Sequence, residues 1–278
     1  MVISTEIIQS VMIPLLVAFA ISVALSPFVI PFLRRLKVGQ TERVEGVQSH
    51  LKKAGTPTMG GTIILISVLV TCLFFVGRYP RIIPVLFLTL GFGIIGFLDD
   101  YLKVVLKRSD GLLPKQKLFC QLAVTTVFVV YLIFKDESGL TMVLPFTDYV
   151  LDIKWITVPL AYFAIIGTDN GVNFTDGLDG LCTSVTIIVA TFFTVVAMTT
   201  VSGIVPITGA VVGALLGFLL FNVYPAQVFM GDTGSLALGG FVASTALVLQ
   251  NPLIILLVGF IYLIEVISVM IQVVYFKK

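Results

Sequence analysis

The sequence predicts an all-α protein, a polytopic integral membrane bundle of about nine helices. Three observations support this prediction. The chain has 278 residues, of which 58% are hydrophobic and only 12% charged, whereas soluble domains carry about 25% charged residues. Apolar runs recur at the length, about 20 residues, that a helix needs to cross a bilayer. Lysines and arginines gather in alternate loops between these runs, as they do in membrane proteins.

Nine segments fit a spanning helix, although the fifth is short and the first and last are long. The first lacks a basic leading region and is too long for a cleavable signal peptide. Its prolines are tolerated in a membrane helix where neighbouring helices satisfy the freed backbone groups. The predicted spans are residues 8–33, 58–76, 82–98, 117–134, 154–168, 181–200, 203–221, 235–250 and 252–276.

The loops between these spans fall into two sets. One set (34–57, 99–116, 169–180, 222–234 and the C-terminal tail) holds thirteen of the seventeen lysines and arginines, counting Lys117 at its border. The positive-inside rule places this set in the cytoplasm and the N-terminus outside. The outer loop 135–153 is expected to be solvated, with a short hairpin around Pro145. Three cysteines without CxxC spacing indicate apolar packing rather than disulfides or zinc.

The cytoplasmic set also gathers acidic motifs, the first of which is Asp99-Asp100 at the inner end of the third span. Adjacent carboxylates at a membrane boundary need a cation or a basic partner. In a helix they point about 100° apart, so we expect one to face a site while the other orients a lysine or acts as a base. A solvated helix end with Lys103 as partner is the alternative.

A second motif, residues 169–181, places three carboxylates and two amides within eleven residues. Asn173, Asp176 and Asp179 are spaced by three and would share one face of a helical turn. A binding site is favoured over capping, which would explain only Asp179.

The third motif, residues 222–235, contains Gly-Asp-Thr-Gly-Ser before a helix. Such a helix N-terminus can receive a phosphate, and Asp232 could hold its Mg²⁺; a cap by Asp232, Thr233 or Ser235 is the alternative.

A fourth motif, residues 52–61, combines lysines, hydroxyls and glycines but is not a Walker P-loop. Together the four motifs predict a site for Mg²⁺ and a phosphorylated ligand, since phosphoryl transfer depends on positioning and charge neutralisation. A transporter is disfavoured because its acids should line a path near the midplane of the bilayer, whereas these lie at loop–helix junctions on one face.

Four ordered motifs, KAGTPTMGG (53–61), FLDDYLKV (97–104), DNGVNFTDGLDGL (169–181) and NVYPAQVFMGDTGSLALGG (222–240), resemble the bacterial phospho-N-acetylmuramoyl-pentapeptide transferases. This family lies within the polyprenyl-phosphate N-acetylhexosamine-1-phosphate transferases. The resemblance implies transfer of phospho-MurNAc-pentapeptide from UDP-MurNAc-pentapeptide to undecaprenyl phosphate, giving lipid I and UMP for peptidoglycan synthesis at the inner face of the bacterial plasma membrane. A sister enzyme that transfers GlcNAc-1-phosphate from UDP-GlcNAc is the alternative.

By matching position, the resemblance implies roles for particular residues. Asp99, Asp100 and Asp232 match three essential aspartates, with Asp232 on Mg²⁺ and Asp99 activating the lipid phosphate. Direct attack is favoured over a covalent aspartyl-phosphate. Substrate binding is expected from the residues Lys53, Thr58, Asn173, Asp176, Asp179, Asn222, Phe229 and Ser235, with Phe229 stacking on uracil.

The resemblance also carries expectations about partners and extent. It implies membrane lipid but no nucleic acid as partner, and it is compatible with a homodimer and with uridine-based nucleoside inhibitors in the same site. The family usually has ten spans, with a three-histidine motif in the loop after the ninth. The expectation is therefore a single integral membrane transferase domain, 1–278, without that last cytoplasmic loop and the final helix.

Overall fold

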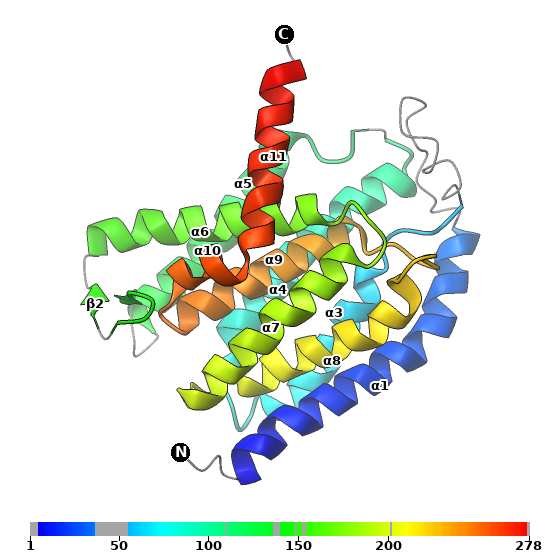
Figure 1. Cartoon of the computed structure of the whole chain (residues 1–278). Coiled ribbons are helices and arrows are strands. Elements are labelled where there is room, and N and C mark those ends of the chain that lie inside the picture. The colour runs from blue at the N-terminus through cyan, green and yellow to red at the C-terminus, as the bar shows by residue number, and fades with distance from the viewer. Residues whose placement is uncertain are drawn as a thin grey trace.

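A computed structural model describes residues 5–36, 55–108, 110–135, 140–147, 149–151, 154–200 and 202–276. Each of the nine predicted spans contains a helix, and the order of elements is drawn in Figure 1. The helices are α1 (Thr5–Arg35), α3 (Gly61–Phe75), α4 (Ile82–Val104), α5 (Pro114–Phe134), α6 (Lys154–Thr175), α7 (Leu181–Thr199), α8 (Val205–Asn222), α9 (Gly231–Val248), the 3-10 turn η1 (Pro252–Ile254), α10 (Ile255–Val258) and α11 (Phe260–Phe276).

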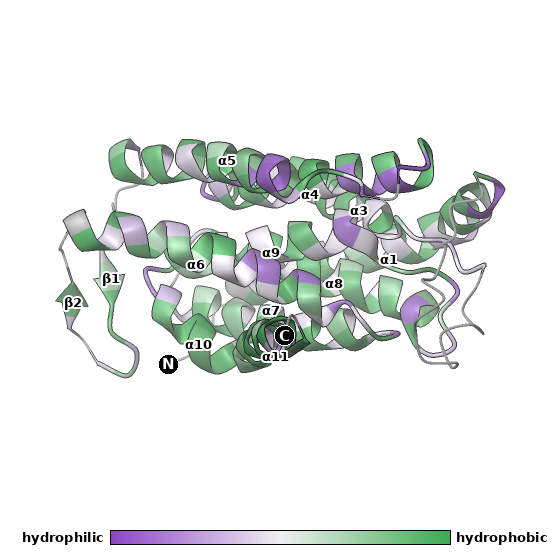
Figure 2. Cartoon of the chain, turned by 90° about the horizontal axis from the view of Figure 1, so that it is seen from above, coloured by the Kyte–Doolittle hydropathy of each residue, from purple (hydrophilic) through white to green (hydrophobic). Residues whose placement is uncertain are grey.

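The helices make a multi-pass membrane bundle. Among the described residues, five helices (α1, α4, α5, α7 and α8) are long and apolar enough to cross a membrane, and the bent final segment makes six if it is one span. Figure 2 shows that apolar residues predominate along these helices. Spanning by α3, α6 and α9 stays a prediction; α3 is apolar but has only 15 residues.

The final predicted span is divided into two parts. Residues Pro252–Val258 and Phe260–Phe276 meet at an angle of 78°, and α11 points away from the bundle (Figure 1). Gly259 stands at the bend, where a Cβ atom would lie 2.9 Å from the carbonyl oxygen of Ile255. Tyr262 anchors the start of α11, since it is buried and its hydroxyl lies 2.8 Å from that of Thr186 on α7.

Helix α9 lies at the centre of the bundle. Every residue from Thr233 to Val248 is buried, and the helix packs against α3, α4, α6 and α7. Glycines allow backbones to approach this closely. A Cβ on Gly96 of α4 would lie 2.0 Å from the carbonyl oxygen of Asp232, and one on Gly61 of α3 would lie 2.1 Å from the backbone nitrogen of Gly234. The first turn of α9 is thus held between α3 and α4.

The predicted outer hairpin is present. Strands β1 (Met142–Val143) and β2 (Val150–Leu151) pair antiparallel around Pro145. The backbone N–H of Val143 donates to the carbonyl of Gln250, 2.7 Å away, which ties the hairpin to the end of α9. The three cysteines are free thiols, with Cys72 and Cys182 buried and Cys120 half-buried, so the predicted packing role is confirmed.

Candidate active site

The predicted motifs converge at one end of the bundle. The backbone N–H groups of Gly60 and Gly61 donate to the carbonyls of Phe229 and Met230 at 2.9 and 2.8 Å, and the N–H of Phe229 donates to the carbonyl of Pro57 at 2.8 Å. These bonds join the fourth motif to the third along their backbones. The third motif is also joined to the second, because the backbone N–H of Ala226 donates to Asp179 Oδ2 at 3.1 Å.

Asp99 and Asp100 turn to different partners, as their helical spacing predicted. Asp99 is 2% exposed. Its Oδ1 accepts from the backbone N–H of Leu112 at 2.7 Å, and its Oδ2 accepts from Lys103 Nζ at 2.9 Å. Gly111 permits the loop to approach, since its φ is +58° and a Cβ there would lie 2.3 Å from Asp99 Oδ1. Asp99 therefore faces the loop that follows α4 and one lysine.

Asp100 instead caps helix α9 from another helix. Its carboxylate accepts from the backbone N–H of Asp232 at 3.2 Å, and from the backbone N–H and hydroxyl of Thr233 at 2.9 and 2.6 Å. The first N–H groups of a helix have no partner within it. No side chain of α9's own N-cap residue, Met230, supplies one. The carboxylate at the positive end of the helix dipole thus fixes the position of Asp232.

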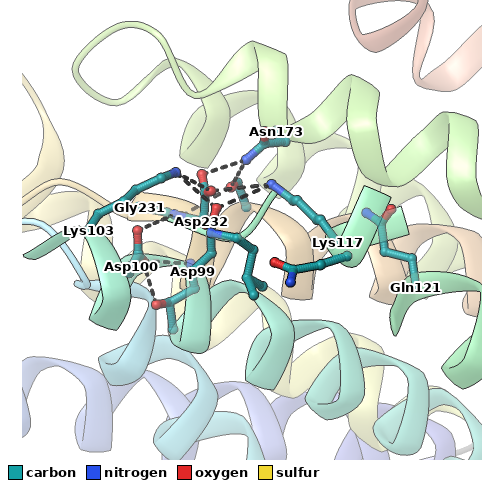
Figure 3. Close-up of polar contacts among 12 residues, drawn as sticks. Asp99, Asp100, Lys103, Lys117, Gln121, Asn173, Gly231 and Asp232 are labelled. Carbon is teal, nitrogen blue, oxygen red and sulfur yellow. Dashed lines mark hydrogen bonds and ion pairs between the residues drawn. The ribbon is translucent and has the colours of Figure 1, made fainter. Parts of the chain in front are cut away.

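Asp232 is the centre of the polar cluster drawn in Figure 3. Its Oδ2 accepts from Lys103 Nζ at 3.0 Å and Lys117 Nζ at 3.3 Å, and its Oδ1 accepts from Asn173 Nδ2 at 2.9 Å. Burial by itself would raise the pKa of this carboxyl. A hydrogen bond with Asp99 and the charges of Lys117 and Lys103 outweigh burial and hold that pKa below its usual value. Asp232 is therefore an ionised carboxylate with two ammonium neighbours.

From the sequence, Lys103 was named only as a helix-end partner of the paired aspartates, and Lys117 was given no role. Lys103 bridges Asp99 and Asp232, and Lys117 lies 3.7 Å from Asp99 as well as beside Asp232. The position of Lys103, four residues after Asp99 on one helix, was a usable signal. No local pattern pointed to Lys117, which comes from α5. Gln121, one turn further along α5, was also missed; its amide donates to buried Asp169.

Three predicted binding residues line the same cluster. Asn173 donates to Ser235 Oγ at 2.8 Å as well as to Asp232. Asp176 follows the last residue of α6, and the backbone N–H of Gly231 acts to lower its pKa. Burial, with the negative charges of Asp232 and Asp100, raises the pKa of Asp176 well above its usual value. The second and third motifs therefore meet side chain to side chain, as expected of one site.

The other predicted binding residues lie where the loops join. Asp179 holds the 222–230 loop rather than capping α7, whose N-cap is Gly180. Asn222 is 3% exposed and engaged within the protein, since it accepts from Thr183 and donates to the carbonyl of Val228. Thr58 is buried and Phe229 half-buried in the joined segments. Lys53 lies outside the described residues.

The donor set fits a magnesium ion that is shared with a phosphate. Mg²⁺ is usually held by one or two carboxylates together with substrate phosphates, and keeps several waters. Asp232 and Asp99 supply two such carboxylates. Within the described residues, no three His, Cys, Asp or Glu side chains gather as a group that could hold a metal ion. These two carboxylates would leave the remaining ligands of such an ion to water and to the phosphate.

Comparison with known proteins gives the family. Residues 82–250 match the family model described as glycosyl transferase family 4, and residues 53–65 match phospho-N-acetylmuramoyl-pentapeptide-transferase signature 1. The phospho-N-acetylmuramoyl-pentapeptide-transferase of Acetivibrio thermocellus is 51% identical over 264 residues, which cover 94% of this chain and 80% of that protein. The chain belongs to the phospho-N-acetylmuramoyl-pentapeptide-transferase family. The phospho-N-acetylmuramoyl-pentapeptide-transferase of Bacillus subtilis is 46% identical over 275 residues, which cover 97% of this chain and 84% of that protein.

Membership in this family makes the chain a transferase and confirms the resemblance drawn from its four motifs. The signature begins in the fourth motif and extends into α3. In the structure its described part is bonded to the loop before Asp232. The segment that carries the family signature therefore also supports the acidic cluster.

Proposed function

We propose that the chain transfers phospho-MurNAc-pentapeptide from UDP-MurNAc-pentapeptide to undecaprenyl phosphate. An oxygen of the lipid phosphate attacks the phosphorus that carries the sugar. The bond from that phosphorus to the bridging oxygen breaks, and UMP leaves with the bond's electron pair. The products are lipid I, with a new diphosphate, and UMP. The names of the relatives and the matched signature support this substrate over UDP-GlcNAc.

The observation that carries the proposal is the pair of carboxylates with two lysines between them. Asp99 and Asp232 come from different helices, yet Lys103 contacts both at 2.9 and 3.0 Å. Lysine ammonium groups can neutralise phosphate oxygens, and phosphoryl transfer depends mainly on such neutralisation and on positioning. The Lys103 side chain is 38% exposed, so the cluster is open to a ligand from solvent. A cluster with only a structural role would not need two lysines at such an open position.

Each residue of the cluster has a proposed task. Asp99 orients and deprotonates the attacking lipid phosphate. Lys103 and Lys117 neutralise charge on the phosphates, and Asp232 holds Mg²⁺. When bound, Mg²⁺ supplies charge neutralisation at the diphosphate. Asp100 positions Asp232 through the α9 cap.

The nucleotide part of the donor is proposed to lie against the joined loops. Phe229 stacks on uracil, a contact worth about 1–3 kcal/mol in nucleic-acid systems. The other proposed binding residues are Lys53, Thr58, Asn173, Asp176, Asp179, Asn222 and Ser235. Asn222 acts through the loop, because its amide is already engaged there. A homodimer and uridine-based inhibitors in this site stay predictions.

The site is proposed to face the cytoplasm of a bacterial plasma membrane. Its two lysines belong to the basic set of loops, which the positive-inside rule places in the cytoplasm. That face also receives a soluble UDP-linked sugar. Labelling of single introduced cysteines in the 105–113 and 140–147 segments of intact cells would test the orientation, because only the second should react with an impermeant reagent.

UMP release from UDP-MurNAc-pentapeptide tests the function. We expect release that requires both undecaprenyl phosphate and Mg²⁺, with a new lipid-linked product. Preference for UDP-GlcNAc would assign the chain to the sister reaction instead. A burst of one UMP per protein without the lipid acceptor would indicate a covalent aspartyl-phosphate rather than direct attack. Lack of release with either sugar by folded protein would refute the proposed function.

A further inference from the structure

Asp169 is a buried carboxylate of α6 for which the proposed reaction has no task. The side chain is 0% exposed. It packs against Gly239 of α9, where a Cβ would lie 2.7 Å from Asp169 Oδ1. Its Oδ2 accepts a hydrogen bond from the amide of Gln121 on α5. Asp169 therefore sits between three helices, one of which carries Lys117.

The hydrogen-bonding capacity of Asp169 is only half used. Its Oδ1 is buried and has no hydrogen-bond partner, and among the described residues no lysine or arginine forms an ion pair with it. Burying a carboxylate is costly unless it is paired with a cation and fully hydrogen-bonded. A neutral amide from Gln121 does not meet that requirement. The arrangement is that of an acceptor that lacks its cation.

Burial raises the pKa of Asp169 well above its usual value, and the charge of Lys117 opposes that rise. Lys117 precedes Gln121 by four residues, so the two side chains lie on one face of α5 (Figure 3). A lysine has a flexible four-carbon stem and can move its ammonium group over several ångströms. In the present structure that ammonium is beside Asp232 at 3.3 Å and Asp99 at 3.7 Å.

A divalent cation on Asp232 would compete with this ammonium group. Both lysines already lie against Asp99 and Asp232, and a metal ion at Asp232 repels them. Lys103 has an alternative, since it bonds to Asp99 and its side chain is 38% exposed. Lys117 is only 17% exposed and has less access to water. Its other neighbour, Asp99, is already bonded to Lys103 at 2.9 Å and lies 3.7 Å away, so a closer acceptor within the protein would hold the displaced ammonium.

We propose that Asp169 is this acceptor, a positioning residue that receives the Lys117 ammonium when a divalent cation binds to Asp232. The inference rests on the proposed function, which places Mg²⁺ at Asp232. Movement of Lys117 to Asp169 Oδ1 satisfies the buried oxygen and removes a competing charge from the metal site. Gln121 holds Asp169 in place for both states through Oδ2.

The test is a titration of Mn²⁺, used as a paramagnetic substitute for Mg²⁺, into purified protein, with free Mn²⁺ measured by electron paramagnetic resonance. Four proteins are compared: wild type, Asp169→Asn, Lys117→Met and the double variant. Asp169→Asn should raise the Kd for Mn²⁺ about tenfold or more, as loss of a residue behind a metal ligand typically does. In the Lys117→Met background the same substitution should change the Kd less than about twofold, because no ammonium needs the acceptor.

Controls separate this role from folding and from net charge. Asp169→Asn keeps the acceptor for Gln121, so its thermal unfolding without cation should match wild type. Asp110→Asn removes the same charge from an exposed loop residue and should leave the Kd unchanged. Equal loss of Mn²⁺ affinity in both backgrounds, or none in either, would overturn the proposal. If the protein releases UMP but binds no Mn²⁺, the role of Asp169 is refuted and the transferase function stands. If the folded protein neither releases UMP nor binds Mn²⁺, both proposals are refuted.

Discussion

Replacement of Asp100 by alanine should destabilise the protein far more than replacement of Asp99 by asparagine. Asp100 is 4% exposed and accepts three hydrogen bonds from the first turn of α9. Thr233, which supplies two of the donors, is 0% exposed, so without the carboxylate neither donor reaches water. Each unsatisfied buried group costs about 1–3 kcal/mol. We therefore expect Asp100→Ala to lower the free energy of unfolding by about 3 kcal/mol or more.

The assay is thermal unfolding in detergent, followed with a thiol-reactive dye. Cys72 and Cys182 are buried free thiols, so their reaction with the dye reports unfolding above a constant background from half-buried Cys120. A chain of this size shifts its midpoint by about 2–4 °C per kcal/mol, so Asp100→Ala should unfold roughly 6–12 °C below wild type. Asp99→Asn keeps an acceptor for Leu112, and Lys103 and Lys117 keep Asp232 as their ion-pair partner. Its midpoint should stay near wild type while UMP release is lost. Equal midpoints for the two variants would refute the cap.

Three further outcomes are expected. Asp232→Asn should lower turnover by about 100-fold or more, because it removes charge from the reacting centre. Its unfolding midpoint should stay close to wild type. Near-normal turnover across Mg²⁺ concentrations would contradict the metal assignment. Gly231→Ala should destabilise the chain by about 1–3 kcal/mol, since the φ of Gly231 is +73° and a Cβ would lie 2.6 Å from Thr58 Oγ1; an unchanged unfolding midpoint would show that the turn relaxes. Phe229→Ala should raise KM for the UDP-sugar about 5- to 150-fold, as loss of a stack worth about 1–3 kcal/mol implies, with kcat less affected; an unchanged KM would exclude stacking.

Much of the fold follows from local features of the sequence. Every predicted span contains a helix, because the length of an apolar run and its distance from charges are properties of one segment. The hairpin around Pro145 is present for a similar reason. The bend of 78° at Gly259 was not predicted. Apolar residues lie on both sides of that glycine, and the angle depends on contacts of α10 with α9 and of α11 with α6 and α7.

The acidic motifs were predicted to gather, and the divergence of Asp99 from Asp100 followed from the 100° step of a helix. Their partners could not be predicted in this way. The Asp100 carboxylate caps a helix that begins more than a hundred residues later in the chain. Residues 173 and 235 were both predicted to bind substrate, yet the Asn173–Ser235 hydrogen bond itself depends on how α6 crosses α9.

The sequence by itself therefore determined the membrane-spanning class, the helices, the face that carries the acidic motifs and the family. The tertiary structure decided which carboxylate faces Lys103 and Lys117, which one caps α9, and which one is left with an unpartnered oxygen behind Gln121. The physical reason is the range of the interactions involved. Hydropathy and helical geometry act over one turn or one span, whereas ion pairs and caps form between helices that glycines 61, 96 and 239 allow to approach within contact distance.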